Sequence, residues 1–138
     1  MKEVLIDTDI LSMFLRGHKK VKSKFKKYLT YYSTINISIV SYYEILSGLK
    51  YKNANKQLES FLELCKVVSI IPITKESCKN SADIYANLKR SGEIIDDVDI
   101  LIAGICLERS LVLVTNNIKH FSRIKNIEIV NWSLSISQ

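Results

Sequence analysis

An acidic residue stands directly before the most apolar segment of the chain. Asp99 precedes residues 100–107, an uncharged run of aliphatic residues, Ala, Gly and Cys that is typical of a helix buried on all sides. A carboxylate at the start of such a helix is costly to desolvate unless a cation or the helix N-terminus compensates its charge. This constraint favours a buried helix whose first turn belongs to a site.

Two further acids are attached to apolar segments. The short apolar run 4–6 ends at the acidic triplet 7–9, and Glu44 lies in the mostly apolar segment 42–46. Together with Asp99 these acids are far apart in the sequence, yet each adjoins a predicted core element. The pattern indicates one shared cation site.

Length and composition predict one soluble globular domain. The chain has 138 residues, of which 47% are hydrophobic and 25% charged, which suits one globular domain over residues 1–138 with a substantial core. No apolar run has the length of a membrane span. The net charge of +6 favours a polyanionic partner, although many proteins with other roles have a similar charge.

The cysteines and the N-terminus predict a cytoplasmic protein. Cys65, Cys78 and Cys106 lack the spacing of metal ligands, and three cysteines cannot all pair within one chain. Reduced thiols and the absence of a signal-peptide pattern both fit the cytoplasm.

Short β-branched runs alternate with amphipathic segments. Strands are predicted at residues 4–6, 34–39, 67–71, 111–114 and 127–130. Helices are predicted over residues 9–15, 19–29, 41–50, 55–65 and 97–108. A further helix is predicted to begin at a cap formed by Thr74 or Ser77 and to end at Gly92, with Cys78, Ala82, Tyr85 and Leu88 at helical spacing. This alternation predicts a central parallel sheet covered by helices on both faces, a three-layer α/β/α fold.

Active sites of such sheets form beyond the carboxyl ends of the strands. Asp7 directly follows the first strand, Glu44 lies about one turn into the helix after the second, and Asp99 opens the helix before the fourth. Carboxylates without His or Cys suit Mg²⁺, or Mn²⁺, which bind carboxylates together with substrate phosphate. The set therefore predicts a metal site for phosphodiester hydrolysis.

Each acid also has a structural interpretation. Asp9 is expected to cap the first helix, and Asp7 alone could be a turn residue. Asp99 alone could be a first-turn acid favoured by the helix dipole, and Glu44 alone could lie on a solvated helix face. Spacing alone leaves these alternatives open.

Polar residues after the fourth strand are further candidates. The turn 115–117 (Thr-Asn-Asn) can reach the same edge of the sheet, although it also suits an Asx-turn. His120 is interpreted as a loop or surface residue and not as a general base. The basic residues between Arg16 and Lys27 form either a solvated helix face or a track that leads the phosphates of a polyanion toward the acids.

The ordered motifs resemble PIN-domain ribonucleases of the VapC toxin type. The matching segments are residues 5–11, 41–48, 96–104, 113–117 and 120–121, with a closing Asn131-Trp132. The resemblance extends from Met1 to about Trp132, in order and at the spacing of the family. A lone Asp-Thr-Asp is a weak signal, whereas the ordered set is a strong one.

The resemblance implies a metal-dependent endoribonuclease that is held inactive by a cognate antitoxin and usually forms a homodimer. It assigns the catalytic acids to Asp7, Glu44 and Asp99, with Asp7 and Asp99 as the first candidates for direct metal ligands and Glu44 as a third. A metal-activated water then cleaves RNA to leave 5′-phosphate and 3′-hydroxyl ends. Many PIN domains have a fourth acid where this chain has Asn117, which puts a second tightly bound metal in doubt while leaving an amide oxygen to orient water or an ion. Asp96 and Asp97 match variable positions and are accessory.

Two other functions remain open at this stage. The two-residue spacing of Asp7 and Asp9 after a strand also suits an aspartyl-phosphate phosphatase of the haloacid-dehalogenase type, but Leu11 departs from that family and no convincing phosphate-binding lysine follows. The other alternative is a degenerate PIN fold that only binds a partner. The intact acids argue against it, whereas Asn117 keeps it open.

Overall fold

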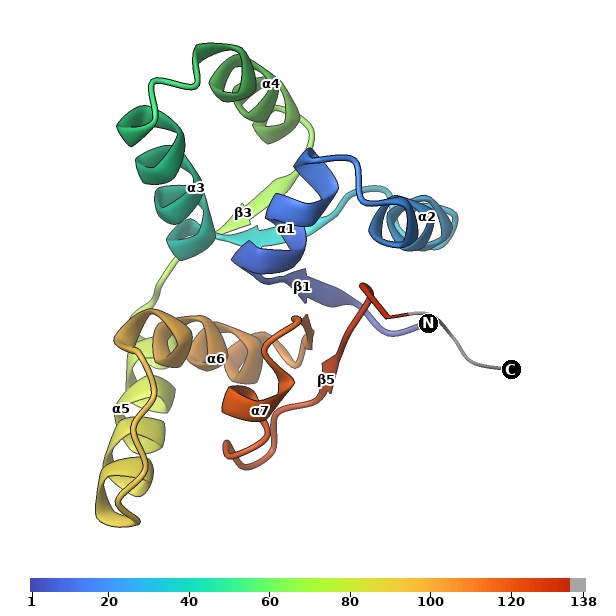
Figure 1. Cartoon of the computed structure of the whole chain (residues 1–138). Coiled ribbons are helices and arrows are strands. Elements are labelled where there is room, and N and C mark those ends of the chain that lie inside the picture. Colours follow the sequence, from blue (N-terminus) through green and yellow to red (C-terminus); the bar gives the residue numbers. More distant parts are fainter. Residues whose placement is uncertain (135–138) are drawn as a thin grey trace.

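The centre of the molecule is a parallel sheet of five short strands. The computed structural model describes residues 1–134. Its strands are β1 (Val4–Ile6), β2 (Asn36–Ser38), β3 (Ser69–Ile71), β4 (Val112–Val114) and β5 (Ile129–Val130). They lie in the order β3-β2-β1-β4-β5, and every neighbouring pair is parallel (Figure 1).

Seven helices occur in the described part of the chain. They are α1 (Thr8–Leu15), α2 (Lys19–Tyr28), α3 (Ile39–Tyr51), α4 (Asn55–Cys65), α5 (Lys75–Arg90), α6 (Asp97–Arg109) and α7 (Ile118–Phe121). No helix within residues 1–134 combines the length and the apolar character needed to cross a membrane.

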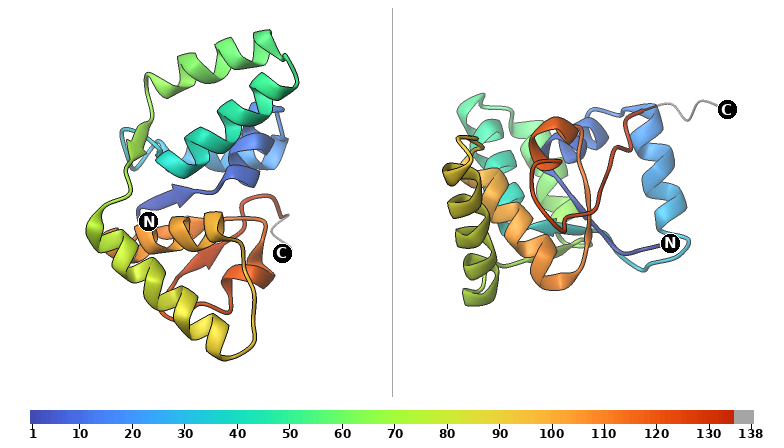
Figure 2. Two further views of the ribbon diagram at one scale, coloured as in Figure 1. Left: turned by 90° about the vertical axis from the view of Figure 1, so that its left-hand side faces the viewer. Right: turned by 90° about the horizontal axis from the view of Figure 1, so that it is seen from below.

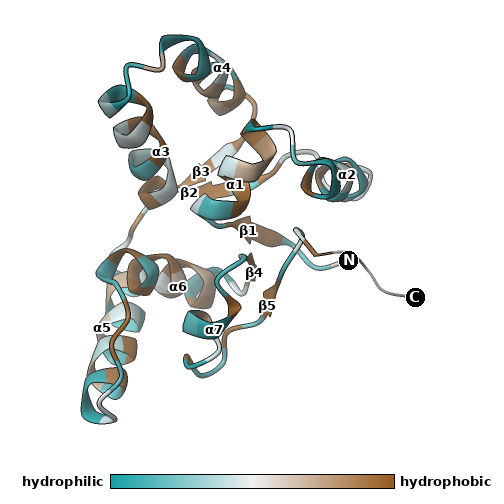
Figure 3. Ribbon diagram, viewed as in Figure 1, coloured by the Kyte–Doolittle hydropathy of each residue, from teal (hydrophilic) through white to brown (hydrophobic). Residues whose placement is uncertain are grey.

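The helices form a layer on each face of the sheet (Figure 2). Alternate strand residues point to opposite faces. Leu5 and Leu113 join a core with α5 and α6, whereas Ile6 and Val114 join a second core with α1 and α2. Strands β1, β4 and β5 consist of aliphatic residues, while the outer turns of the helices are hydrophilic (Figure 3). The three-layer α/β/α prediction is confirmed.

Local capping explains where the elements depart from their predicted bounds. Ser38 accepts a hydrogen bond from the backbone N–H of Ser41 and is the N-cap of α3. Helix α3 therefore begins at Ile39, and the predicted strand 34–39 shortens to β2. The short helix α7 was not predicted, because the turn chemistry of residues 115–117 gives no sign of a helical turn after it.

The buried face of α5 differs from the apolar residues expected along it. Cys78, Ala82 and Tyr85 are exposed, and only Leu88 of that set is buried. The helix instead turns Ser77 and Ser81 inward, together with Ile84 and Leu88. The reason is close packing against α6, and Ser81 donates a hydrogen bond to the carbonyl of Ile100 at 2.9 Å.

Gly104 makes this close packing possible. A Cβ built on Gly104 would lie 2.0 Å from Ser81 Oγ and 2.4 Å from the carbonyl oxygen of Ser77. The backbones of α5 and α6 therefore meet where neither helix has a large side chain. This contact holds α6, and with it the first turn that contains Asp99.

We predict that Gly104→Ala lowers the free energy of unfolding by about 1–3 kcal/mol, because the added methyl group must push the two helices apart. Gly48→Ala is the matched control: Gly48 lies in α3, and its added Cβ meets no atom within 4 Å. It should raise stability by about 0.5–1 kcal/mol, since alanine loses less backbone entropy in a helix. Urea denaturation measures both. Equal stability of the Gly104 variant and the wild type would refute the tight contact.

Candidate active site

The candidate site lies at the carboxyl ends of β1 and β4, where the chain switches from one half of the sheet to the other. Strands β2 and β3 continue from one side of β1, whereas β4 and β5 lie on its other side. Ligands of open α/β sheets bind in the crevice at such a switch point. Asp7 ends β1 here, and Thr115 ends β4.

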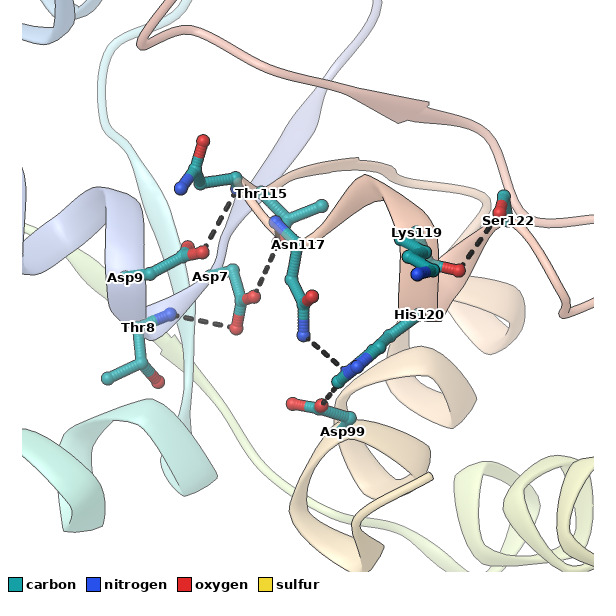
Figure 4. Close-up of polar contacts among 10 residues, drawn as sticks. Asp7, Thr8, Asp9, Asp99, Thr115, Asn117, Lys119, His120 and Ser122 are labelled. Carbon is teal, nitrogen blue, oxygen red and sulfur yellow. Dashed lines mark hydrogen bonds and ion pairs between the residues drawn. The ribbon is translucent and has the colours of Figure 1, made fainter. Parts of the chain in front are cut away.

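Asp7 joins these two strand ends. Its side chain accepts a hydrogen bond from the Thr8 backbone N–H at 2.8 Å, and its other carboxylate oxygen accepts one from Thr115 Oγ1 at 2.7 Å (Figure 4). Its own N–H donates to the carbonyl of Val114. Asp7 is thus the N-cap of α1 while only 5% of its surface is exposed.

This arrangement corrects the expected role of Asp9. Asp9 was expected to cap the first helix, but Asp7 does so and Asp9 lies in the first turn of α1. One Asp9 carboxylate oxygen accepts from the N–H of Ile10, and the other accepts from the N–H of Asn116 at 3.0 Å. Asp9 therefore holds the loop after β4 against α1.

Glu44 reaches the same edge through a chain of hydroxyl groups. Thr8 Oγ1 contacts both Glu44 Oε1 and Ser41 Oγ, and Ser41 Oγ lies 3.3 Å from Ser38 Oγ. A hydroxyl group has one proton to donate, so Thr8 donates to the carboxylate and accepts from Ser41. These hydroxyl groups therefore hold Glu44 against Thr8, the residue that directly follows Asp7.

Asp99, Asn117 and His120 form the third part of the site. Asp99 lies in the first turn of α6, with 18% of its side chain exposed, and its Oδ2 is 3.9 Å from His120 Nδ1 (Figure 4). The same ring nitrogen lies 2.8 Å from Asn117 Nδ2. In the neutral tautomer that accepts this bond, the Asn117 amide oxygen remains available to water or an ion.

The acids repel one another in a poorly solvated setting. Burial, followed by the charge of Asp9, raises the pKa of Asp7 to about 7, and Asp99 adds to the shift. Burial and the charges of Asp96 and Glu44 raise the pKa of Asp99 to about 6. Burial also raises the pKa of Asp9. Apart from His120, which lowers the pKa of Asp99, the charges that act on Asp7 and Asp99 belong to other acids near this edge, so Asp7, Asp9, Glu44 and Asp99 lie near one another.

The donor set fits a hard divalent cation. Carboxylate oxygens dominate, and the basic group beside them is His120. Within residues 1–134, no three His, Cys, Asp or Glu side chains are already close enough to hold a metal together. Mg²⁺ commonly uses one or two carboxylates and keeps several waters, so the neighbouring acids suffice for it without a closed cage.

Several site residues were not among the predicted acids. Thr8 and Ser41 orient Glu44, and the sequence signal for Ser41 is its position three residues before Glu44 on the same helix face. His120 was interpreted as a loop or surface residue; it is about half exposed, but it contacts the site. Asp96 and Asp97, in contrast, are exposed at the start of α6, and Asp96 makes no side-chain capping bond.

The basic helix α2 lies away from these acids. The Tyr28 hydroxyl accepts from the N–H of Val4, at the amino end of β1. Lys22 and Lys26 line a groove beside Ile35 and Val68, before the starts of β2 and β3. The groove along α2 therefore opens at the opposite edge of the sheet. Of the two interpretations of the basic stretch, this position favours a solvated helix face for Lys22 and Lys26 over a track that leads phosphates to the acids.

Comparisons with known proteins agree with this architecture. The model of the PIN domain family matches residues 4–127. Ribonuclease VapC2 of Rickettsia felis is 29% identical over 129 residues, which cover 93% of this chain and 96% of the relative. Ribonuclease VapC1 of Methanocaldococcus jannaschii is 30% identical over 128 residues, which cover 89% of this chain and 82% of the relative.

A solved structure has the same fold. The crystal structure of DNA-bound VapBC from Salmonella typhimurium contains a chain that matches with a TM-score of 0.85 and 25% identity, over 96% of this chain and 99% of that one. The family match covers both the crevice at the strand ends and the segments that carry its acids. The chain therefore belongs to the PIN domain family.

Proposed function

We propose that this protein is a Mg²⁺-dependent endoribonuclease and the toxin of a toxin–antitoxin pair. The observation that carries the proposal is the acidic cluster of Asp7, Glu44 and Asp99 at the switch point of a PIN-domain sheet. The ribonuclease names of its relatives give the reaction class. The VapBC complex of Salmonella typhimurium supports a cognate antitoxin as the partner.

The acids divide the work of the site. Asp7 and Asp99 would hold the cation directly, because burial and repulsion from neighbouring acids raise the pKa of both, and a bound cation would offset that cost. Glu44, fixed by Thr8, accepts a proton or a hydrogen bond from a water at the edge of the site. Mg²⁺ bound there would supply Lewis-acid activation of water and stabilise charge on the phosphate.

Two groups orient the rest of the crevice. Thr115 holds Asp7 through its hydroxyl, and the Asn117 amide nitrogen bonds His120, which leaves the amide oxygen to bind water or an ion. Asn117 has no charge, so it contributes less to cation affinity than a fourth carboxylate would. We therefore propose one tightly held cation.

The phosphatase alternative is not supported by the geometry. That class needs a motif of two acids after the strand, with Asp7 as the nucleophile. The second acid of that motif, Asp9, is bound to the loop at Asn116. The family match also does not point to that class.

The site of action and the oligomeric state belong to the same proposal. We expect the protein to act in the cytoplasm, in keeping with the free thiols of Cys65, Cys78 and Cys106. A homodimer is expected as well, and sedimentation equilibrium of the purified protein tests it.

Asp99→Asn should reduce RNA cleavage by orders of magnitude without loss of the fold, because it removes the charge that draws the cation to α6. Purified wild type and variant are incubated with total RNA in Mg²⁺ or EDTA, and the cleavage ends are mapped. The wild type should yield 5′-phosphate and 3′-hydroxyl ends only when Mg²⁺ is present. Asp83→Asn, an exposed acid of α5, is the control and should cleave normally. Cyclic 2′,3′-phosphate ends or full activity in EDTA would overturn the proposal.

The titration of Asp7 predicts a pH-dependent stability in metal-free buffer. The folded protein holds the Asp7 proton more tightly than the unfolded chain, in which the pKa is near 3.8. The resulting stabilisation is fully present below that value and is lost as the pH rises through about 7. The free energy of unfolding should therefore decline over this window.

Asp7→Asn should remove part of that decline, since the amide is neutral at every pH in the window. Urea denaturation of both proteins in EDTA between about pH 4 and pH 8 measures the difference. Added Mg²⁺ should raise the melting temperature of the wild type at the alkaline end more than that of the variant. Parallel pH profiles of the two proteins would show that Asp7 is not the group responsible.

A further inference from the structure

We propose that the RNA strand beside the scissile phosphate lies in a groove between α1, α3 and α4, where Arg16, Lys52 and Lys56 bind its backbone phosphates. The inference rests on the proposed ribonuclease function and adds the path of the substrate to it. It also replaces the basic track that the sequence suggested along α2.

The groove is continuous with the acidic cluster. It is a cavity of about 520 Å³, and Thr8 and Glu44, two residues of the site, form one of its ends. Its other lining residues belong to α1, α3 and α4 and to the turn between α3 and α4. Figure 1 shows α1 beside these two helices. A strand whose phosphate lies at the acids can therefore continue into the groove.

The end remote from Asp7 is cationic. Arg16 is the C-cap of α1, Lys52 is the C-cap of α3, and Lys56 lies in the first turn of α4. All three are exposed, and none makes a side-chain hydrogen bond or an ion pair within residues 1–134. Glu44, at the site itself, is the only acid that lines the groove among the described residues.

The floor of the groove suits the rest of a nucleotide. Leu15, Ile45 and Leu49 give it an apolar surface for the faces of sugars and bases, while Gly48 leaves open space where a side chain would stand. Three cations without protein partners, spread over three helices, fit a chain of regularly spaced phosphates. They also attract a polyanion toward an acidic site that would otherwise repel it.

The groove along α2 serves as an internal comparison. Lys19, Lys22 and Lys26 line it over an apolar floor that contains Phe14 and Phe25. It has a similar chemistry, but it opens before the strands and shares no residue with the acidic cluster. Both grooves have three basic residues, so their charge does not distinguish them. They differ in their position relative to the acids of the site.

The test compares two triple variants with the same change in charge. Arg16→Gln/Lys52→Gln/Lys56→Gln alters the proposed groove, and Lys22→Gln/Lys26→Gln/Lys27→Gln alters α2; each lowers the net charge from +6 to +3. Both are made in the Asp99→Asn background, so that a fluorescent single-stranded RNA stays intact. Its affinity is measured by anisotropy as a function of salt concentration.

We expect the groove variant to bind at least about tenfold more weakly and to have a shallower salt slope, by about two units for three lost phosphate contacts. The α2 variant should retain most of the affinity and slope. Gly48→Gln adds a neutral side chain to the groove in a helix-compatible position, and it should weaken RNA binding without lowering the melting temperature.

Three results would overturn the groove. The first is an equal loss of RNA affinity in the two triple variants, and the second is an unchanged RNA affinity in the groove variant. The third is a groove variant that still binds RNA but is no longer neutralised by the cognate antitoxin, which would make the groove a protein-binding surface. The same triple variants are also assayed for cleavage with Asp99 intact. A wild type that neither binds nor cleaves RNA refutes the proposed function, whereas a wild type that cleaves RNA beside a groove variant that binds it normally refutes the groove alone.

Discussion

The buried carboxylate of Asp7 holds together the centre of the molecule. It follows β1, caps α1 and accepts a hydrogen bond from the hydroxyl of Thr115 at the end of β4. Desolvating a carboxylate is unfavourable, and the neighbouring Asp9 adds to the cost, as the raised pKa indicates. The backbone and hydroxyl donors around Asp7 offset part of this cost. They explain how an acid is retained where an apolar residue would give a more stable fold. A protein that keeps such a residue trades stability for chemistry, and the position of the acid at the switch point is consistent with that trade.

The sequence predicted the sheet well because buried parallel strands are short and apolar on both faces. Residues 4–6 and 111–114 required no information from elsewhere in the chain to be recognised. The face of α5 was not predictable in the same way. Cys78, Ala82 and Tyr85 repeat at helical spacing, yet Ser77 and Ser81 are buried, because the approach of α6 at Gly104 selects for small residues instead of apolar ones. Such a preference depends on a partner helix that is distant in the sequence.

The site also has features that the sequence predicts and features that it does not. Acids adjoining apolar runs were identifiable, because a charge beside a buried segment needs a physical reason. The hydroxyl chain from Ser38 to Glu44 and the contact between Asn117 and His120 were not, since serine, threonine and a half-exposed histidine are common in loops and at helix starts. The N-cap of α1 was assigned two residues too late for a related reason. Both Asp7 and Asp9 are good N-cap residues, and only the path of the chain decides which of them has the extended backbone of a cap.

The acids of the site are supplied from opposite faces of the sheet. Asp7 begins a helix of one hydrophobic core, and Asp99 begins a helix of the other. An ion held between them would connect the two helical layers at the edge of the sheet, in addition to the short strands of two or three residues that lie between them. Binding of a cation at the site would then slow amide hydrogen exchange in both helical layers, including residues far from the site. The ion would stabilise the fold as well as take part in the chemistry.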